Sequence, residues 1–419
     1  MAKQESLTGK IDWITVLLYG ALVLFGWAAI YSAVYTDEGK TIFDPSVNSG
    51  KQLQWIIACV ILAFIILIID SRFYVTFSYP IYAGVLLFAI SVMFLGTSVK
   101  GQKNWIRIGG FQMQPSELAK FAVSLAVAKF LSGLNVDIRK WKDKWRIFAI
   151  VGIPPLIILA QGDAGQAIVF VIFALVLFRE GLEPYFLIVG ASVIVLSLLA
   201  LLFPPLTISC ILAAVAGLLI YQFRKKKRTS WFVAGICMVS IAYIFSVNYG
   251  FNKVLKPHQK DRINVLLGKE VENGKDWNVR QSVIAIGSGG FLGKGYLNGT
   301  QTKLKFVPEQ STDFIFSSIG EEFGFIGSTV LILMFVALFF RLLFLAERQR
   351  SKFSRVYGYC VASILLFHFL INVGMAIGVA PVIGIPLPLI SYGGSSLLSF
   401  TILIFIFIRL DTQRFDAMR

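Results

Sequence analysis

The sequence has little charge for its length and very little histidine or cysteine. Charged residues make up 15% of the chain and hydrophobic residues 57%, whereas soluble domains contain about a quarter charged residues. The two histidines, His258 and His368, lie far apart, and the four cysteines all lie in apolar runs with no CxxC pair. This scarcity argues against a soluble protein, a zinc site and a thiol nucleophile.

Linkers rich in proline, glycine or serine are also absent, and apolar runs recur from Ile11 to Leu410. We therefore predict one integral membrane domain over residues 1–419. The first apolar run, 11–35, is too long for a signal-peptide core and lacks a small-residue cleavage site, so we expect it to stay in place as a helix.

Twelve apolar runs are candidates for membrane spans. Each must be helical, because lipid offers no partners for free backbone amides. The predicted spans are 11–35, 52–70, 74–97, 116–133, 147–161, 164–179, 184–203, 207–223, 231–249, 326–346, 356–379 and 395–410. The predicted fold is therefore an all-α, polytopic membrane bundle of twelve helices.

The net charge of +16 reports on orientation once the basic residues are assigned to loops. The densest short basic clusters are 134–146, 224–230 and 347–355, and twelve helices place all three on the same side as both termini. The positive-inside rule assigns that side to the cytoplasm. The segment 250–325 then forms a large extracytoplasmic loop. We interpret the basic loops as topology signals and anionic-lipid contacts, and we expect no nucleic-acid partner.

Four polar stretches fall on the outward side, and the first is 101–120. Pro115 suits the first position of a helix, and the nearby carboxylate of Glu117 complements the helix dipole. Lys120 follows at i+3 and is able to pair with Glu117. The stretch is either a capping and salt-bridge device or the wall of a polar cavity, in which Arg107 and free amides suit a pyrophosphate.

The second stretch, 161–166, places Asp163 near membrane depth between two spans. An ionisable group there indicates either a functional site or an interfacial turn. Another stretch, 380–396, has three prolines and three glycines and cannot be a regular helix, so we expect it to line the site rather than face lipid. Ser391 and Tyr392 are its candidate substrate contacts.

The remaining stretch lies in the loop 250–325 and contains the candidate catalytic residue, Asp313. Apolar residues follow it directly, and apolar neighbours tune a carboxylate toward the basicity of a general base. Three glutamates lie close in sequence and are able either to strengthen this effect or to hold a divalent cation such as Mg²⁺ or Mn²⁺. They are Glu309, Glu321 and Glu322.

A glycine-rich string, GSGGFLGKG, precedes Asp313 in the same loop. It matches neither a P-loop nor a dinucleotide-binding fingerprint, so we do not expect a nucleotide site. Its lysine, Lys294, is either a contact to a lipid-borne phosphate or a solvated turn residue.

The four stretches together resemble the RodA/FtsW family of cell-wall polymerases, the SEDS proteins of shape, elongation, division and sporulation. The matching motifs occur in family order and the resemblance covers nearly all the chain. They are NWIRIGGFQMQPSELAK, QSVIAIGSGGFLGKG, FVPEQSTDFIF followed by GEEFGFIG, and PLPLISYGGSS. The last motif and the short N-terminal tail look closer to the elongation branch, RodA, than to the division branch, FtsW.

The resemblance implies a peptidoglycan glycosyltransferase of the bacterial inner membrane that joins lipid II units into glycan strands. It also implies a class B penicillin-binding protein and other membrane proteins of the elongation complex as partners. The essential aspartate of the family falls on Asp313, its charged pair on Glu117 and Lys120, and its inter-helix aspartate on Asp163. Arg262 and Lys294 also occupy family positions. The family typically has ten helices, so we expect an extra pair among the seventh to ninth spans.

In this chemistry an α-linked donor gives a β-linked product, so a single inverting displacement with one base is enough. We expect Asp313 to take the proton from the acceptor hydroxyl while cations stabilise the leaving pyrophosphate. The candidate cations are Arg107, Lys120, Arg262 and Lys294. Two other functions stay open: a lipid II flippase, weakened by the lack of a clear inverted repeat, and a non-catalytic scaffold for the cross-linking enzyme.

Overall fold

The computed structural model describes residues 7–35, 41–99, 102–108, 111–254, 260, 264, 277–304 and 306–414. The chain forms two compact units, one made of residues 1–182 and 277–419 and the other of residues 183–276. We call these the main unit and the insert unit and describe each by itself. That the whole chain acts as one membrane domain stays a prediction.

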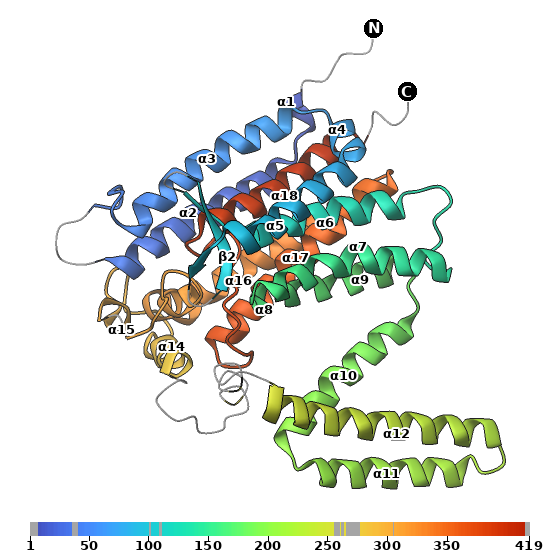
Figure 1. Cartoon of the computed structure of the whole chain (residues 1–419). Helices are drawn as coiled ribbons and strands as arrows, with labels where there is room; N and C mark the ends of the chain where they lie inside the picture. Colours follow the sequence, from blue (N-terminus) through green and yellow to red (C-terminus); the bar gives the residue numbers. More distant parts are fainter. Residues whose placement is uncertain are drawn as a thin grey trace. The chain divides into compact units, whose positions relative to one another are not determined.

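The main unit is a bundle of helices around a buried centre (Figure 1). Its helices are α1 Leu7–Lys10, α2 Trp13–Val34, α3 Asn48–Ile68, α4 Ser71–Thr76, α5 Ser78–Leu95, α6 Pro115–Leu131, α7 Trp141–Ala160, α8 Ala164–Ile168, the 3₁₀ turn η1 Val169–Ile172, α9 Phe173–Arg179, α14 Trp277–Ser288, α15 Thr300–Lys303, α16 Ile315–Glu347, α17 Lys352–Ala376 and α18 Gly394–Thr412. Nearly all of α6 is buried, and α17 and α18 are 61% and 83% buried over their most apolar windows. By contrast, α5 is only 17% buried and presents apolar side chains outward, as a lipid-facing helix does.

Local sequence explains where several of these helices begin. Asp12 caps α2 by accepting a hydrogen bond from the Thr15 backbone amide (3.0 Å). Pro115 occupies the first turn of α6, where a missing amide costs no hydrogen bond. Asp163 caps α8 through the Gln166 amide (3.1 Å). Asp163, which was predicted as a site residue, therefore also has a structural role as the N-cap of α8.

Every one of the twelve predicted spans coincides with a helix or a run of short helices. Nine helices in the described part of the chain are long and apolar enough to cross a membrane, which makes this a multi-pass membrane protein. The other three predicted spans correspond to α6, with 17 residues, to α7, which contains two prolines, and to the broken run α8–η1–α9. Twelve crossings therefore stay a prediction.

A small antiparallel sheet interrupts the helical fold and was not predicted. Its strands are β1 Thr97–Val99, β2 Gln102–Ile108 and β3 Phe111–Met113, in the order β1-β2-β3. Thr97 lies opposite Trp105, and Arg107 lies opposite Gln112. The sheet was missed because the short alternating run around Trp105 resembles one face of an amphipathic segment as much as a strand.

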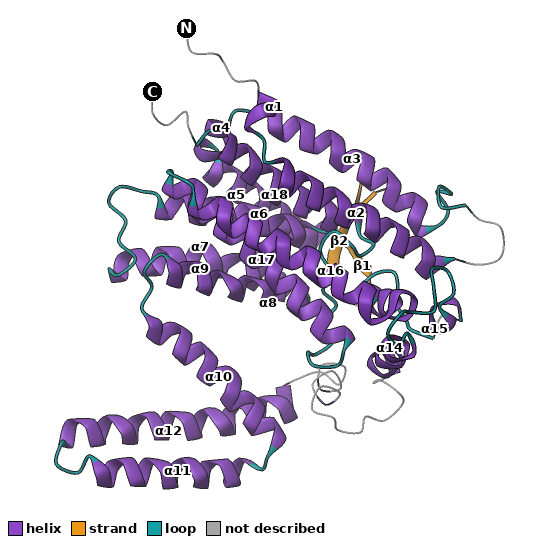
Figure 2. Cartoon of the chain, turned by 180° about the vertical axis from the view of Figure 1, so that it is seen from behind, coloured by secondary structure: helices purple, strands orange, loops and turns teal. Residues whose placement is uncertain are grey.

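The two ends of the main unit differ in character, as Figures 1 and 2 show from opposite sides. At one end lie α1, α4 and the end of α18; at the other lie β2, α14 and α15. We call the first end the basic end. The end of α16 lies there, because Arg348 pairs with Asp411 of α18 (2.5 Å) and Glu347 pairs with Arg179 at the end of α9 (3.0 Å). The loop after α6 lies beside it, because Ile138 is next to Gly181. Within the main unit, the basic loops after α6 and α16 therefore lie at the same end as the start of α2 and the end of α18. The side of the membrane on which this end and the two termini lie stays a prediction.

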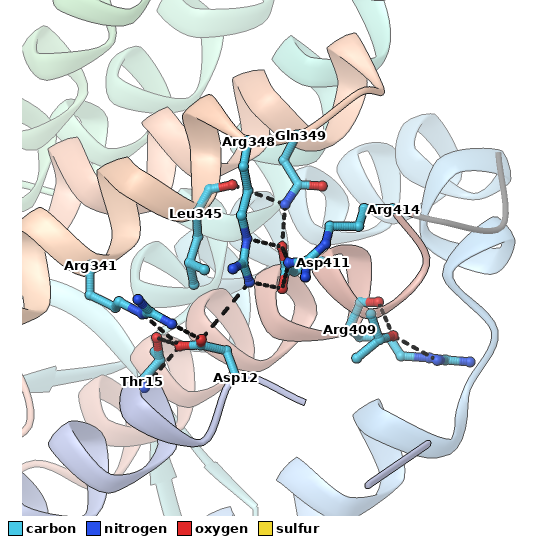
Figure 3. Close-up of polar contacts among 10 residues, drawn as sticks. Asp12, Thr15, Arg341, Leu345, Arg348, Gln349, Arg409, Asp411 and Arg414 are labelled. Atoms are coloured by element: carbon cyan, nitrogen blue, oxygen red, sulfur yellow. Dashed lines mark hydrogen bonds and ion pairs between the residues drawn. The ribbon is translucent and has the colours of Figure 1, made fainter. Parts of the chain in front are cut away.

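An ion-pair network joins three helices at the basic end (Figure 3). The Arg348 guanidinium lies between Asp411, at 2.5 Å, and Asp12, at 3.9 Å. Arg341 makes a second ion pair with Asp12, and Arg414 pairs with Asp411 at 3.2 Å. The network links the start of α2 to the ends of α16 and α18. Both aspartates are buried, so each needs these partners.

The insert unit consists of three apolar helices and a π-helical turn. These are α10 Pro184–Leu202, α11 Pro205–Gln222, α12 Lys227–Tyr249 and η2 Gly250–Val254. Ala200, Ile208 and Ile244, one from each helix, form its small core. The other side chains are largely exposed, which suits helices surrounded by lipid. The basic loop 224–226 joins α11 to α12, in the region where the extra helix pair is predicted.

Candidate functional site

The segment 377–393, between α17 and α18, has no regular secondary structure, which agrees with the irregular backbone predicted for 380–396 except at 394–396, where α18 has already begun. It is held by the turn that precedes α16. Ser391 accepts a hydrogen bond from the Leu387 amide (2.8 Å) and donates one to the Thr312 carbonyl (2.6 Å). The Tyr392 amide donates to the Ser311 carbonyl (2.9 Å). Ser391 is buried, so its contacts with its own chain show it holding two segments together.

Asp313 lies where these two segments meet. Its backbone carbonyl accepts a hydrogen bond from the side chain of Asn372 on α17 (2.8 Å). An added Cβ atom on Gly384 would lie 3.3 Å from Asp313 Oδ2, which places the carboxylate directly against the 377–393 segment. Phe314 and Ile315, which follow, are fully buried. Asp313 itself stays partly exposed at the edge of this apolar core.

The Asp163 turn packs against the same segment from another side. An added Cβ on Gly165 would lie 2.5 Å from the Ile383 carbonyl oxygen, so only glycine allows this approach. The Asp163 carboxylate accepts hydrogen bonds from Asn104 on β2 (2.7 Å) and from Gln114 before α6 (2.8 Å). Segments from four distant parts of the sequence thus converge here, as the shared location of the four polar stretches predicted.

Glu117 and Lys120 form a buried ion pair on α6. Lys120 Nζ lies 2.6 Å from Glu117 Oε2 and 3.0 Å from His368 Nε2 on α17. His368 Nδ1 lies 3.0 Å from the Ile364 carbonyl oxygen. A carbonyl oxygen only accepts, so Nδ1 carries the proton and donates it to this bond, and Nε2 accepts a hydrogen bond from the Lys120 ammonium. Lys120 is fully buried, and its ammonium also lies 4.9 Å from the centre of the Phe400 ring. The positive charge of Lys120 therefore interacts with groups inside the protein and not with solvent.

Gln166 connects this ion pair to the Asp163 turn. Its side-chain amide donates to Glu117 Oε1 (2.6 Å), while its backbone amide donates to Asp163 Oδ1 (3.1 Å). The three predicted residues Glu117, Lys120 and Asp163 thus belong to one buried polar network.

Lys294 belongs to a second network, around the carboxylate of Glu321 on α16. Lys294 Nζ lies 2.7 Å from Glu321 Oε1, and Thr302 donates to Oε2 through both its amide (3.0 Å) and its hydroxyl (2.7 Å). The Gln301 amide adds a further bond (2.9 Å). Lys294 is 26% exposed in its side chain and is an ion-pair partner rather than a fully solvated turn residue.

The glycine-rich string has a packing explanation. The helix α16 is interrupted at Gly324, whose φ of 61° and ψ of −157° are not helical, and the backbone there pairs with the string. The Phe325 amide donates to the Gly290 carbonyl (2.9 Å). An added Cβ on Gly293 would overlap the Glu322 carbonyl oxygen. The glycines therefore allow two backbones to meet, which is a reason other than phosphate binding for their presence.

The remaining predicted site residues belong to neither of these two networks, and one of them lies outside the part of the chain that the structure describes. Arg107 is exposed on β2. Glu309 is exposed, with a left-handed φ of 57°, and accepts a bond from the Thr312 hydroxyl (3.0 Å). Tyr392 is partly buried, and this burial raises its pKa above that of an exposed tyrosine. Arg262 lies outside the described residues.

The three glutamates considered for a divalent cation do not form a ligand set. Glu321 is occupied by the donors described above, Glu322 accepts a hydrogen bond from Ser32, and Glu309 is turned to Thr312. Over the described ranges, no group of three or more His, Cys, Asp or Glu side chains is arranged to hold a metal ion. We therefore derive no chemical step through a metal.

Sequence reasoning missed two polar residues on α17, His368 and Asn372. They lie at i and i+4 and thus on one face of the helix, within the apolar run 356–379. A fully buried histidine and asparagine in a membrane helix are costly, which makes them candidates for a functional site. That spacing was the signal available in the sequence.

The fold and the site define a multi-pass membrane protein with a buried polar network and a partly exposed aspartate at one end of its bundle. The model of the FtsW/RodA/SpoVE family of cell cycle proteins matches residues 12–232 and 179–415. The peptidoglycan glycosyltransferase RodA of Treponema pallidum is 34% identical over 416 residues, which cover 92% of this chain and 94% of that protein. The peptidoglycan glycosyltransferase MrdB of Escherichia coli is 30% identical over 390 residues, which cover 93% and 90%.

This chain is also similar to a chain of a solved structure. A chain in a structure described as "Structural coordination of polymerization and crosslinking by a peptidoglycan synthase complex" has a TM-score of 0.68 and 26% identity, with 97% of this chain and 98% of that chain covered. The protein therefore belongs to the FtsW/RodA/SpoVE family, and it is a membrane glycosyltransferase of that family.

Proposed function

We propose that this protein polymerises lipid II into glycan strands for cell elongation, with Asp313 as the general base. The observation that carries the proposal is the position of the Asp313 carboxylate. It lies against Gly384, where the turn before α16 meets the irregular 377–393 segment, and the Asp163 turn packs beside the same segment. A partly exposed carboxylate next to a buried polar network suits a base that must meet a substrate hydroxyl.

The proposed step is a single displacement with inversion. Asp313 removes the proton of the acceptor sugar's 4-hydroxyl, and the resulting oxygen attacks the anomeric carbon of the donor. The bond from that carbon to the pyrophosphate breaks, and the lipid pyrophosphate departs with the electron pair. The leaving group needs charge stabilisation more than it needs a general acid, because a pyrophosphate is already a good anion.

Two of the four candidate cations for that leaving group are already paired within the protein. Lys120 is enclosed by Glu117 and His368, and Lys294 is paired with Glu321, so we propose that both support the site rather than bind pyrophosphate. Arg107 is exposed and belongs to the same small strand as Asn104, which binds Asp163. We therefore propose Arg107, together with Arg262, as the leaving-group contacts.

We further propose that the site faces away from the cytoplasm of the bacterial inner membrane and that both termini face the cytoplasm. The ion-paired basic end supports this, because basic loops stay inside, and Asp313 lies just before the start of the 33-residue helix α16, whose other end carries Arg348 in the basic end. A class B penicillin-binding protein is the proposed partner. The similarity to a chain of a peptidoglycan synthase complex that couples polymerisation to cross-linking supports a partner of that kind.

The proposal is tested with Asp313→Asn in the purified full-length protein supplied with lipid II. We expect polymer formation on a gel to fall by a factor on the order of 10²–10⁴, which is what loss of a general base costs. Glu347→Gln is the matched control, because it neutralises an exposed carboxylate paired with Arg179 near the basic end. We expect that control to keep its activity.

Two outcomes would contradict the assignment. If folded Asp313→Asn polymerises lipid II at a near wild-type rate, Asp313 is not the base. If the wild-type protein moves fluorescent lipid II across liposomes but makes no polymer with or without its partner, the protein is a flippase.

A further inference from the structure

Asn372 joins the two segments that meet at the candidate base. It lies on α17 and its side chain is fully buried. Its Nδ2 group donates one hydrogen bond to the Asp313 carbonyl (2.8 Å) and another to the Ile385 carbonyl (2.7 Å). The first carbonyl belongs to the turn before α16 and the second to the 377–393 segment. A single side chain on a rigid, buried helix therefore holds both.

The chemistry of these two bonds calls for an amide. A side-chain amide nitrogen carries two N–H groups, enough to supply one donor to each carbonyl. Rotating the amide by half a turn would place Oδ1 of Asn372 against two carbonyl oxygens, so the orientation is fixed. Leucine has nearly the same shape but no donor. The side chain at position 372 therefore supplies two hydrogen-bond donors in addition to filling the space.

Asp313 lies in a turn, because the helix begins only at Ile315. The bonds from Ser391 and Tyr392 hold the two residues before Asp313, and the bond from Asn372 holds Asp313 itself. Its turn has internal bonds on one side, where the amides of Thr312 and Phe314 both donate to the Glu309 carbonyl (3.0 and 3.2 Å). The bond from Asn372 fixes Asp313 from the other side. A general base must stay within hydrogen-bond reach of its proton, and a displacement of about 1 Å costs about a hundredfold in rate.

We propose that Asn372 is a positioning residue for glycosyl transfer, which fixes the backbone of Asp313 to the 377–393 segment through its two N–H groups. This inference rests on the proposed function, since it gives Asn372 a role only if Asp313 is the base.

The experiment compares four variants of the full-length protein in the lipid II assay. Asn372→Leu keeps the volume and removes both donors, and Asn372→Ser keeps one donor. Gln349→Leu is the matched control. Gln349 is also buried and donates twice, to the Leu345 carbonyl (3.0 Å) and to Asp411 (2.6 Å), but it lies at the basic end. Asp313→Asn serves as the reference for the proposed function itself.

We expect Asn372→Leu to lower kcat by about 10- to 100-fold, because the base loses its fixed position. The KM for lipid II should stay within about twofold, because Asn372 contacts its own chain and not the substrate. The serine variant should have an intermediate kcat. Gln349→Leu should lower the melting temperature to a similar extent without lowering kcat.

Each contrary result is distinct. A folded Asn372→Leu with wild-type kcat overturns the inference, as does a fall in kcat that Gln349→Leu reproduces at equal loss of melting temperature. If the leucine variant does not fold, Asn372→Ala removes the same donors and is judged by the same outcomes. If Asp313→Asn is active, the proposed function fails instead, whatever Asn372 does.

Discussion

Adding one methyl group beside Asp313 tests whether the rate of polymerisation depends on the position of its carboxylate. Gly384 has a left-handed φ of 77°, and an added Cβ would lie 3.3 Å from Asp313 Oδ2. Gly378, six residues earlier, has a φ of 79°, and its added Cβ would lie 3.3 Å from Val279 Cγ1. The two alanine substitutions therefore impose the same backbone strain and an equally tight contact. They differ in the neighbour that must move.

The expected sizes follow from this geometry. A left-handed alanine costs roughly 1–2 kcal/mol, so both variants should lose about that much free energy of unfolding. At Gly384 the carboxylate must also move by a few tenths of an ångström. Scaled from about a hundredfold per ångström, that shift predicts a kcat about three- to tenfold lower for Gly384→Ala. We expect no such loss for Gly378→Ala.

The assay measures initial rates of lipid II polymerisation together with thermal unfolding for both variants in the same detergent. Equal kcat values for Gly384→Ala and Gly378→Ala, at equal stability, would refute the claim that the Asp313 carboxylate acts from its position against Gly384.

Two further predictions concern the supports of the site and the opposite end. Gly293→Ala should unfold the protein or lower its melting temperature far more than Gly290→Ala. An added Cβ at Gly293 would overlap the backbone carbonyl of Glu322, whereas one at Gly290 would have nothing within 4 Å. Comparable melting curves for the two variants would contradict this packing. At the basic end, burial alone would raise the pKa of Asp12, but the hydrogen bonds from Arg341 and Thr15 and the charge of Arg341 together outweigh burial and lower that pKa below its ordinary value of 3.8. The stabilisation is then complete above about pH 4 and is lost as the pH falls through the lower folded-state pKa. Asp12→Asn should cost about 1–3 kcal/mol at pH 7 and progressively less in acid, and a constant cost across this range would contradict the ion pair.

The parts of the fold that depend on local patterns could be predicted from the sequence. Apolar runs located a helix at every expected position, because membrane spans need long apolar stretches and little else. The proline and glycine content of 380–396 indicated its irregular backbone. The span predicted to start at 326 matches the part of α16 that follows the break at Gly324. The preceding helical part from Ile315 was not predicted, because Glu321 and Glu322 interrupt the apolar run. Their charges are satisfied by distant partners that no local pattern reveals.

The partners within the site could not be predicted, because they come from distant parts of the chain. Lys120 was predicted either to pair with Glu117 or to contact a pyrophosphate, and the structure shows the pair. The prediction took no account of His368, which lies 248 residues away in the sequence and contacts Lys120 from α17. Lys294 and Glu321 were considered separately, although they form one ion pair. Asn372 was hidden within an apolar run, since a single polar residue hardly changes the hydropathy of a span. Sequence patterns thus located the segments of the candidate site, whereas tertiary contacts determine which of their charged side chains are paired within the protein.

Chemical rescue is the most direct test of the central claim, that the carboxylate of Asp313 removes the acceptor's proton. Asp313→Ala should be nearly inactive with lipid II, and added formate should restore polymerisation in proportion to its concentration by supplying the missing carboxylate. Polymerisation by Asp313→Ala at a near wild-type rate without formate would contradict the account.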